Sequence, residues 1–168
     1  TTNESAAVTI HNEDRSTTGF RLHLEEEEGS GLSHASETVG WIAIDNGGTV
    51  AGGLVVAETG NNVTHATSSA TFGGTFASTP VVLIDIQTED GGDTAVARGS
   101  AISTTGISFS VEEEQSANTE INHTTEVIGY YAMDAGVTYD SATGTGADDL
   151  YGGDGLDTLY GGAGADNF

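Results

Sequence analysis

Residues 103–134 read STTGISFSVEEEQSANTEINHTTEVIGYYAMD, and residues 16–45 read STTGFRLHLEEEEGSGLSHASETVGWIAID. The two segments align throughout, with a two-residue insertion in the acidic loop of the second one. Ile107, Phe109 and Val111 alternate with polar residues, which is the period-2 pattern of a strand with one buried face. Short β-branched runs of this kind between Gly, Asn and Ser clusters predict an all-β protein that contains one module twice.

Matched positions of the two copies lie in turns, loops and strands, and eight pairs illustrate this. These pairs are Gly19/Gly106, Glu25/Glu112, His34/His123, Glu37/Glu126, Gly40/Gly129, Trp41/Tyr130, Ala43/Ala132 and Asp45/Asp134. Because His34 and His123 are equivalent, we expect them to do one structural job, such as a hydrogen bond that closes the loop. A transition-metal site at the histidines is the alternative.

The second copy alone is preceded by an upstream half, made of short β-rich runs at residues 53–60, 62–76 and 79–87. The sequence begins in the middle of the first copy. We therefore divide the chain into three parts. They are a half module (residues 1–50), a complete module (residues 51–138) and a tail (residues 139–168).

A half module has an open apolar face and unpaired strand edges, and both are unfavourable in water. We therefore expect other strands to complete residues 1–50. These strands come from an upstream region, from another chain or from the adjacent module. In the alternative arrangement, residues 1–50 pack onto the complete module as extra strands.

Alternation and β-branching place the expected strands along the whole of both modules. The expected ranges are residues 6–11, 18–26, 37–45, 53–58, 63–73, 80–88, 93–99, 106–113 and 125–134. The run VGWIAI at residues 39–44 is apolar on both faces. We therefore expect residues 37–45 to form a central strand.

The tail carries a nine-residue repeat, TGTGADDLY (143–151), GGDGLDTLY (152–160) and GGAGADNF (161–168). It fits the pattern G-G-x-G-x-D-x-U-x, in which U is a large apolar residue. The tail resembles the RTX repeats of bacterial proteins that are secreted by type I systems. This resemblance implies a parallel β-roll that binds calcium.

The chemistry of the repeat suits Ca²⁺ as the cofactor. Glycine lets backbone carbonyls point at an ion without a Cβ in the way, and aspartate adds a hard anionic oxygen. Without calcium the carboxylates repel one another, so we expect the free tail to be disordered. The candidate calcium-binding residues are Gly144, Gly146, Asp148, Gly153, Gly155, Asp157, Gly162, Gly164 and Asp166.

The chain is strongly acidic, with 26 acidic residues, three basic ones and a formal net charge of −23 among 168 residues. This charge excludes nucleic acid as a natural partner, and the lack of a long apolar run excludes membrane insertion. High salt would screen the self-repulsion. We therefore expect a secreted or cell-surface protein of a marine or halophilic bacterium. Because the sequence has no cysteine, it forms no disulfide.

The complete module resembles the H-type lectin domain, an antiparallel β-sandwich. The resemblance spans roughly residues 53–136. The residues that carry it are Phe72, Pro80 to Leu83, Ala97-Arg98, Thr105-Gly106 and Ile128 to Met133. The overall prediction is therefore an all-β chain with an antiparallel H-type-lectin-like β-sandwich and a C-terminal parallel β-roll.

The lectin resemblance also implies a carbohydrate site. The arginine that contacts sugar in the family falls on Arg98, and the family's Trp-His sugar contact falls on Glu114 and Gln115. The guanidinium of Arg98 could hold sugar hydroxyls. A salt bridge from Arg98 to a nearby carboxylate is the alternative.

The glutamate runs at residues 25–28 and 112–114 end a strand and enter a loop. Alternate glutamates would share one face and form a carboxylate cluster. A solvated acidic face is the default interpretation, and a Ca²⁺ site that includes Glu120 and Glu126 is the alternative.

The sequence contains no G-x-S-x-G, no HExxH, no cysteine and no lysine, so we do not expect an enzyme. Two functions remain. The first is a calcium-binding extracellular structural or adhesive protein that self-assembles into a filament or matrix, with strands completing the half module. The second is a carbohydrate-binding module of an adhesin or polysaccharide-degrading enzyme that binds extracellular glycans.

Overall fold

The computed structural model describes residues 7–30 and 34–134, which belong to one compact unit, Thr1–Ala135. Within this part of the chain the fold is all-β and every strand pairing is antiparallel, as the sequence predicts. The strands are β1 (Val8–Glu13), β2 (Arg21–Glu26), β3 (Gly47–Thr49), β4 (Leu54–Glu58), β5 (Ser68–Thr71), β6 (Val81–Ile86), β7 (Ala95–Ser100), β8 (Gly106–Glu113) and β9 (Ile128–Met133). Two single 3₁₀ turns, η1 (Glu28–Ser30) and η2 (Val50–Gly52), are the helical elements of the described residues.

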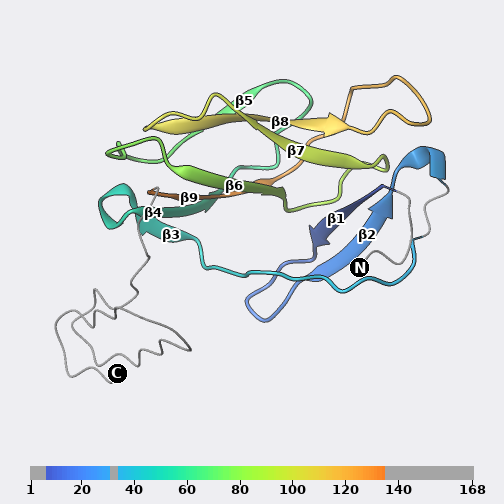
Figure 1. Ribbon diagram of the computed structural model, residues 1–168, viewed down its shortest axis with the longest axis horizontal. Coiled ribbons are helices and arrows are strands. Elements are labelled where there is room, and N and C mark those ends of the chain that lie inside the picture. The colour runs from blue at the N-terminus through green and yellow to red at the C-terminus, as the bar shows by residue number, and fades with distance from the viewer. Residues whose placement is uncertain (1–6, 31–33, 135–168) are drawn as a thin grey trace, which may run out of the picture. The chain divides into compact units, whose positions relative to one another are not determined.

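The complete module forms two facing sheets, and β3, from residues 1–50, joins the edge of the first one. The first sheet has the strand order β3-β4-β9-β6, and the second has the order β5-β8-β7. Figure 1 shows the two sheets as stacked layers, with the separate β1–β2 hairpin beneath them. Strand β9 is central because it pairs with β4 on one edge and with β6 on the other.

One apolar core joins the two sheets. Along β8 buried and half-buried residues alternate, and Ile107, Phe109 and Val111 are 1–2% exposed. From the opposite sheet, Ile128 and Ala132 of β9 are both 0% exposed and belong to the same cluster. The period-2 pattern read from the sequence therefore identifies the buried face correctly.

The β1–β2 hairpin repeats the β7–β8 hairpin in detail. Both have the same pairing register, since Val8 pairs with Glu26 where Ala95 pairs with Glu113. Both turns also place a non-glycine residue at positive φ, Asp14 at 51° and Ala101 at 42°.

A serine closes each of these turns. The hydroxyl of Ser16 donates to the carbonyl of Gly19, and that of Ser103 donates to Gly106. The internal repeat predicted from the sequence is therefore a repeat of structure as well.

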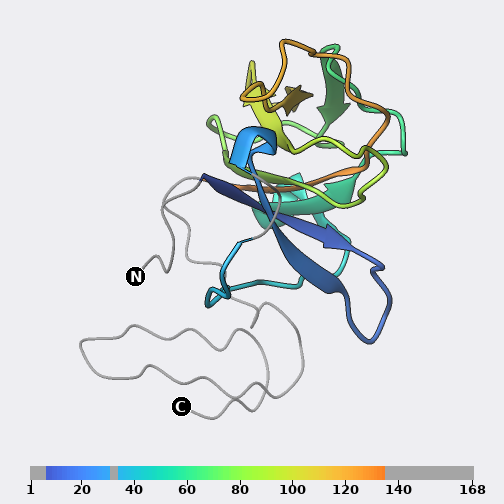
Figure 2. The same cartoon turned by 90° about the vertical axis from the view of Figure 1, so that its right-hand side faces the viewer.

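The hairpin contacts the complete module through polar groups. Arg15 Nη1 lies 2.6 Å from Glu58 Oε2, and Arg15 Nε donates to the carbonyl of Gln87. At the other end, the Thr94 hydroxyl donates to the carbonyl of Glu26. Figure 2 shows the hairpin as a ribbon of its own beside the stacked sheets.

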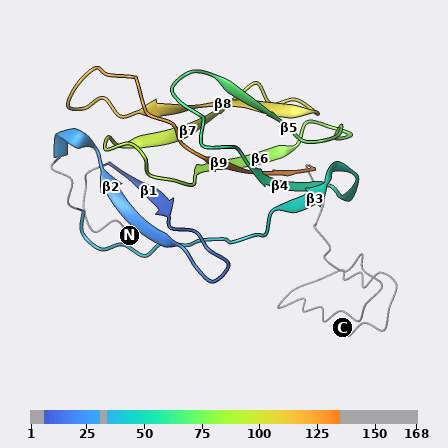
Figure 3. The same cartoon turned by 180° about the vertical axis from the view of Figure 1, so that it is seen from behind.

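The prediction of a central strand over residues 37–45 is wrong in this structure. The segment has no regular structure and runs as a single trace toward β3 (Figure 3). The physical reason lies in its neighbours. The equivalent strand β9 is held between β4 and β6, and the described residues supply no second pair of such strands to flank residues 37–45.

The remaining expected strands are confirmed, with some differences in length. The range 63–73 shortens to β5, preceded by an isolated bridge between Val63 and Glu126. Strand β3 was not expected from the sequence. It consists of Gly47, Gly48 and Thr49, a composition with little strand signal, and it adds an edge to β4.

Candidate functional site

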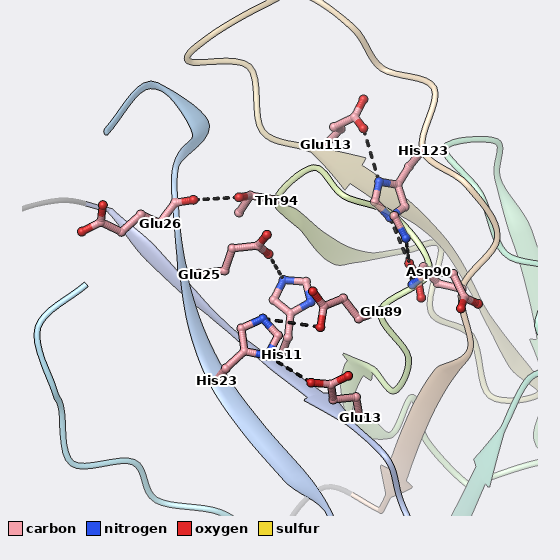
Figure 4. Close-up of polar contacts among 12 residues, drawn as sticks. His11, Glu13, His23, Glu25, Glu26, Glu89, Asp90, Thr94, Glu113 and His123 are labelled. Carbon is pink, nitrogen blue, oxygen red and sulfur yellow. Dashed lines mark hydrogen bonds and ion pairs between the residues drawn. The ribbon is translucent and has the colours of Figure 1, made fainter. Parts of the chain in front are cut away.

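The loop between β8 and β9 is closed by a buried cluster that we name the His123 clasp, formed by Glu113, His123 and Glu126. Nδ1 of His123 lies 3.3 Å from Glu113 Oε1, and Nε2 lies 3.1 Å from Glu126 Oε1. All three side chains are at most 4% exposed. Figure 4 shows the ring with Glu113 on one side.

Glu126 also organises the connection between β6 and β7. Its carboxylate accepts hydrogen bonds from the Thr88 hydroxyl and from the backbone N–H groups of Asp90 and Gly91, at 2.9 and 3.2 Å for the two amides. A Cβ at Gly91 would collide with the His123 ring, so the close approach requires glycine. The clasp therefore ties three separate segments together.

The contacts favour a charged histidine. Both ring nitrogens face carboxylate oxygens, and an ionised carboxylate accepts hydrogen bonds only. Hydrogen bonding to Glu126 is the main cause that raises the pKa of His123, against the effect of burial, and Glu113 adds to it. For Glu126, burial alone would raise the pKa, but the hydrogen bonds from His123, Thr88 and the backbone outweigh it and lower that pKa.

A second cluster of the same kind lies in the half module, and we name it the His34 clasp. Nδ1 of His34 lies 3.1 Å from Glu26 Oε1, and Nε2 lies 3.6 Å from Glu37 Oε1. Each ring nitrogen faces the glutamate equivalent to its partner in the His123 clasp. The expectation that His34 and His123 do one structural job is therefore confirmed.

The sequence prediction includes Glu37 and Glu126 as a matched pair but does not connect them with the histidines, and it does not single out Glu26 and Glu113. Glu26 and Glu113 align in the repeat, as do the two clasp histidines. The alignment therefore indicates that Glu26 and Glu113 share a role, but the default interpretation of the acidic runs as solvated faces does not use it. Thr88 and Gly91 carry no such signal, because their role depends on a fold that brings the β6–β7 connection to the clasp.

The two modules differ in how well their apolar faces are covered. In the complete module, Phe109 is 1% exposed, whereas its equivalent Leu22 is only half-buried. Ala95 is 2% exposed, whereas its equivalent Val8 keeps 41% of its surface exposed. Ile10, on the same face of the hairpin, also keeps 41% exposed. The half module therefore presents a partly open apolar face, as the sequence predicts.

The segment that follows the His34 clasp is more exposed still. Trp41 is 63% exposed, Ile42 80% and Ile44 49%. Tyr130, the equivalent of Trp41 on the inner face of β9, is 8% exposed, whereas Tyr131 and Met133, the equivalents of Ile42 and Ile44, are half-buried on its outer face. We name the partly open hairpin face and residues 39–45 together the open face. Its one aromatic pair among the described residues is the edge-to-face contact of Trp41 with Phe20, at 5.3 Å between ring centroids.

The residues expected to bind carbohydrate lie at separate places. Arg98 is paired across the strands with Glu112, as the salt-bridge alternative proposed, and its side chain is 62% exposed. Arg98 lies opposite Ser110, and Glu114 follows four residues later, just past the end of β8, which corresponds to about 13 Å of extended chain. Gln115 donates to the carbonyl of Glu120.

The glutamates of residues 112–114 have different partners. Glu112 contacts Arg98, and Glu113 belongs to the His123 clasp. Glu114 accepts from Ser116, which is the main cause that lowers its pKa. Glu126, which the calcium alternative added to these residues, is held by the same clasp.

A cluster of Glu13, His23 and Glu89 brings together potential ligand atoms within 4.8 Å of one another. However, the two carboxylates contact opposite nitrogens of His23, both at 3.5 Å. Glu13 is also occupied by Arg21, whose hydrogen bond is the main cause that lowers the pKa of Glu13. This geometry is that of an ion-pair network between β2 and the β6–β7 connection, and Figure 4 shows it beside His11.

The nine candidate calcium-binding residues, from Gly144 to Asp166, lie outside the described residues. Among the described helical elements, none is long and apolar enough to cross a bilayer.

The comparisons with known proteins give one distant relative. The chain is 29% identical over 154 residues to Halomucin of Haloquadratum walsbyi, and the alignment covers 89% of the chain. The chain spans only about 2% of the length of that protein. No protein-family model matches the chain, and no solved structure matches it.

Proposed function

We propose that the chain is a calcium-binding structural segment of an extracellular protein, which self-assembles into a filament or matrix through its incomplete half module. The observation that carries this proposal is the contrast between two copies of one module. The complete copy buries its apolar face, with Tyr130 and Ala95 at 8% and 2% exposure, whereas their equivalents in the half module, Trp41 and Val8, are 63% and 41% exposed. An exposed apolar surface rimmed by polar residues is typical of an interaction site.

The composition supports an extracellular, saline setting. A net charge of −23 keeps such a chain soluble, and salt screens its self-repulsion. The similarity to a protein named Halomucin is consistent with this setting. The proposed organism is a marine or halophilic one.

Calcium has two proposed roles. The repeats that contain Asp148, Asp157 and Asp166 would fold into a parallel β-roll around the ion, as RTX repeats do. Calcium would also neutralise part of the acidic charge and so lower the repulsion between assembling chains. Type I secretion of the unfolded, calcium-free chain is part of this proposal.

The experiment is negative-stain electron microscopy and sedimentation of the purified chain, in calcium and again in chelator. We expect filaments or sheets in calcium that dissolve in chelator. Trp41→Asp should reduce assembly, because it places a charge on the face that the complete module buries with Tyr130. The matched control is Thr38→Asp, at an exposed polar position of the same segment. Discrete particles in both conditions would overturn the proposal.

A second candidate is carbohydrate binding by the complete module, whose two facing antiparallel sheets suit the H-type-lectin-like sandwich. The observation that favours it is the exposure of the Arg98 guanidinium on the surface of β7, where it could exchange Glu112 for sugar hydroxyls. A glycan array of the natural chain and of Arg98→Ala separates this function from assembly. Absence of binding by the natural chain, or binding that Arg98→Ala does not reduce, would refute it.

A further inference from the structure

The strands of the two modules do not balance in number. We name β4, β5 and β6 the upstream set, and β7, β8 and β9 the downstream set. In the complete module each downstream strand packs on or pairs with the upstream set, since β9 lies between β4 and β6 and β8 pairs with β5. The half module contains a second downstream set, formed by β1, β2 and residues 37–45.

The described residues therefore hold one upstream set and two downstream sets. Two copies could assemble by contact between their open faces, but a second copy of the same residues could complete the half module only by withdrawing the upstream set from its own complete module. That exchange would open one apolar face for each face it covers. Strand exchange between identical copies of the described residues therefore cannot cover the apolar face of every downstream set.

We infer that the occupant of the open face is an additional upstream set, a polypeptide segment with the sequence pattern of residues 46–87, supplied by a neighbouring repeat of the same module. This inference rests on the proposed structural function and names its partner. The complete module itself is the evidence for the fit, because it shows the equivalent face covered by this segment with Val55 and Ile86 at 7% and 4% exposure.

The repeat fixes the register of the complex. In β9, Tyr131 is opposite both Val56 and Leu83, and its equivalent in the half module is Ile42. In β8, Ile107 is opposite Ala70, and its equivalent is Phe20. Residues 39–45 would therefore become the central strand that the sequence predicts, with Ile42 between the incoming counterparts of Val56 and Leu83.

The alignment also shows how to build the test. Residue 16 aligns with residue 103, so Thr1 aligns with Thr88. A second copy of residues 46–87 placed directly before Thr1 therefore recreates the spacing of the complete module. Trp41 is the single tryptophan of the chain, and it reports on completion without any label.

The experiment compares tryptophan fluorescence and acrylamide quenching of the natural chain and of the extended chain, both dilute and in calcium. Trp41 is 63% exposed, and in a completed module it should approach the 8% exposure of Tyr130. We therefore expect a shift of emission to shorter wavelength and a severalfold fall in quenching in the extended chain. An extended chain with Val55→Asp and Ile86→Asp in the added copy should retain the emission of the natural chain.

Disulfide trapping tests the register, because the chain has no cysteine of its own. Ile42→Cys should cross-link to Val56→Cys of the added copy and not to Val55→Cys, whose side chain points to the opposite face. An extended chain with Trp41 still exposed and no selective cross-link would overturn the inference. So would a selective cross-link of Ile42→Cys to Val56→Cys between copies of the natural chain on concentration, because the occupant would then be the upstream set of a second copy. That last result would not contradict the proposed self-assembly. If instead the chain does not assemble in calcium, the proposed function is refuted, but the inference about the occupant of the open face is not.

Discussion

Replacing Glu126 with glutamine should destabilise the complete module far more than the equivalent change, Glu37→Gln, destabilises the half module. The Glu126 carboxylate is buried and accepts four hydrogen bonds, from His123, Thr88, Asp90 and Gly91. The amide retains the size but places an NH₂ group toward donors and removes the charge that faces the imidazolium.

The expected magnitude follows from these contacts. A hydrogen bond to a charged group contributes about 1.5–3 kcal/mol, and breaking one side of a buried ion pair costs about 3–5 kcal/mol. We therefore expect Glu126→Gln to lower the free energy of unfolding by about 3 kcal/mol, or roughly 12–24 °C in Tm for a module of this size. The Glu37 side chain is 17% exposed and lies 3.6 Å from His34, so its change should cost less than that of Glu126, whose side chain is 2% exposed and lies 3.1 Å from His123.

The assay is thermal and urea unfolding followed by far-UV circular dichroism, at one pH and one salt concentration. Similar losses for Glu126→Gln and Glu37→Gln would refute the reasoning, because the two clasps would then be equally buried. A loss below about 1 kcal/mol for Glu126→Gln would show that the network contributes little beyond an exposed ion pair.

Four further results are expected. A raised pKa of His123 means that the folded state binds the proton more tightly than the unfolded state does. The stability that His123 contributes is therefore present below about pH 6.5 and is lost as pH rises through the raised pKa. The natural chain should lose Tm over that window, and His123→Gln should not. Gly91→Ala should lower Tm because the new methyl group meets the His123 ring, whereas Gly92→Ala meets nothing within 4 Å and should be close to neutral. Arg98→Ala should change the free energy of unfolding by less than about 1 kcal/mol, since its ion pair is exposed, and a larger loss would give Arg98 a structural role. Asp157→Ala should reduce the calcium bound in isothermal titration, and unchanged uptake would contradict the assignment of the nonapeptide repeats.

The sequence predicts the complete module well because its signals are local. Alternation along Ile107, Phe109 and Val111 identifies a strand and its buried face together. The internal repeat then transfers each assignment to the other copy, and the hairpin of the half module confirms the transfer in its register.

The prediction fails where a strand depends on neighbours rather than on its own residues. Residues 37–45 have the apolar pattern of a central strand, but a central strand needs a partner on each edge. Gly47 and Gly48 of β3 show the converse case, since they form a strand with little propensity because β4 offers an edge.

The candidate site shows the same contrast between features that local sequence signals predict and features that depend on neighbours in the fold. The equivalence of His34 and His123 could be read from the alignment, and it led to the correct expectation of one shared job. The contacts of Glu126 with Thr88 and Gly91 could not, because more than thirty residues separate these partners and only the facing sheets bring them together.

Hydrogen exchange of the natural chain tests the central claim most directly, by comparing residues 39–45 with their equivalents in β9, residues 128–134. The β9 amides lie in a ladder between β4 and β6, whereas residues 39–45 belong to no ladder. The account predicts slow exchange over residues 128–134 and fast exchange over residues 39–45 in the dilute chain. Equal protection of the two segments would contradict it, because the half module would then already be complete.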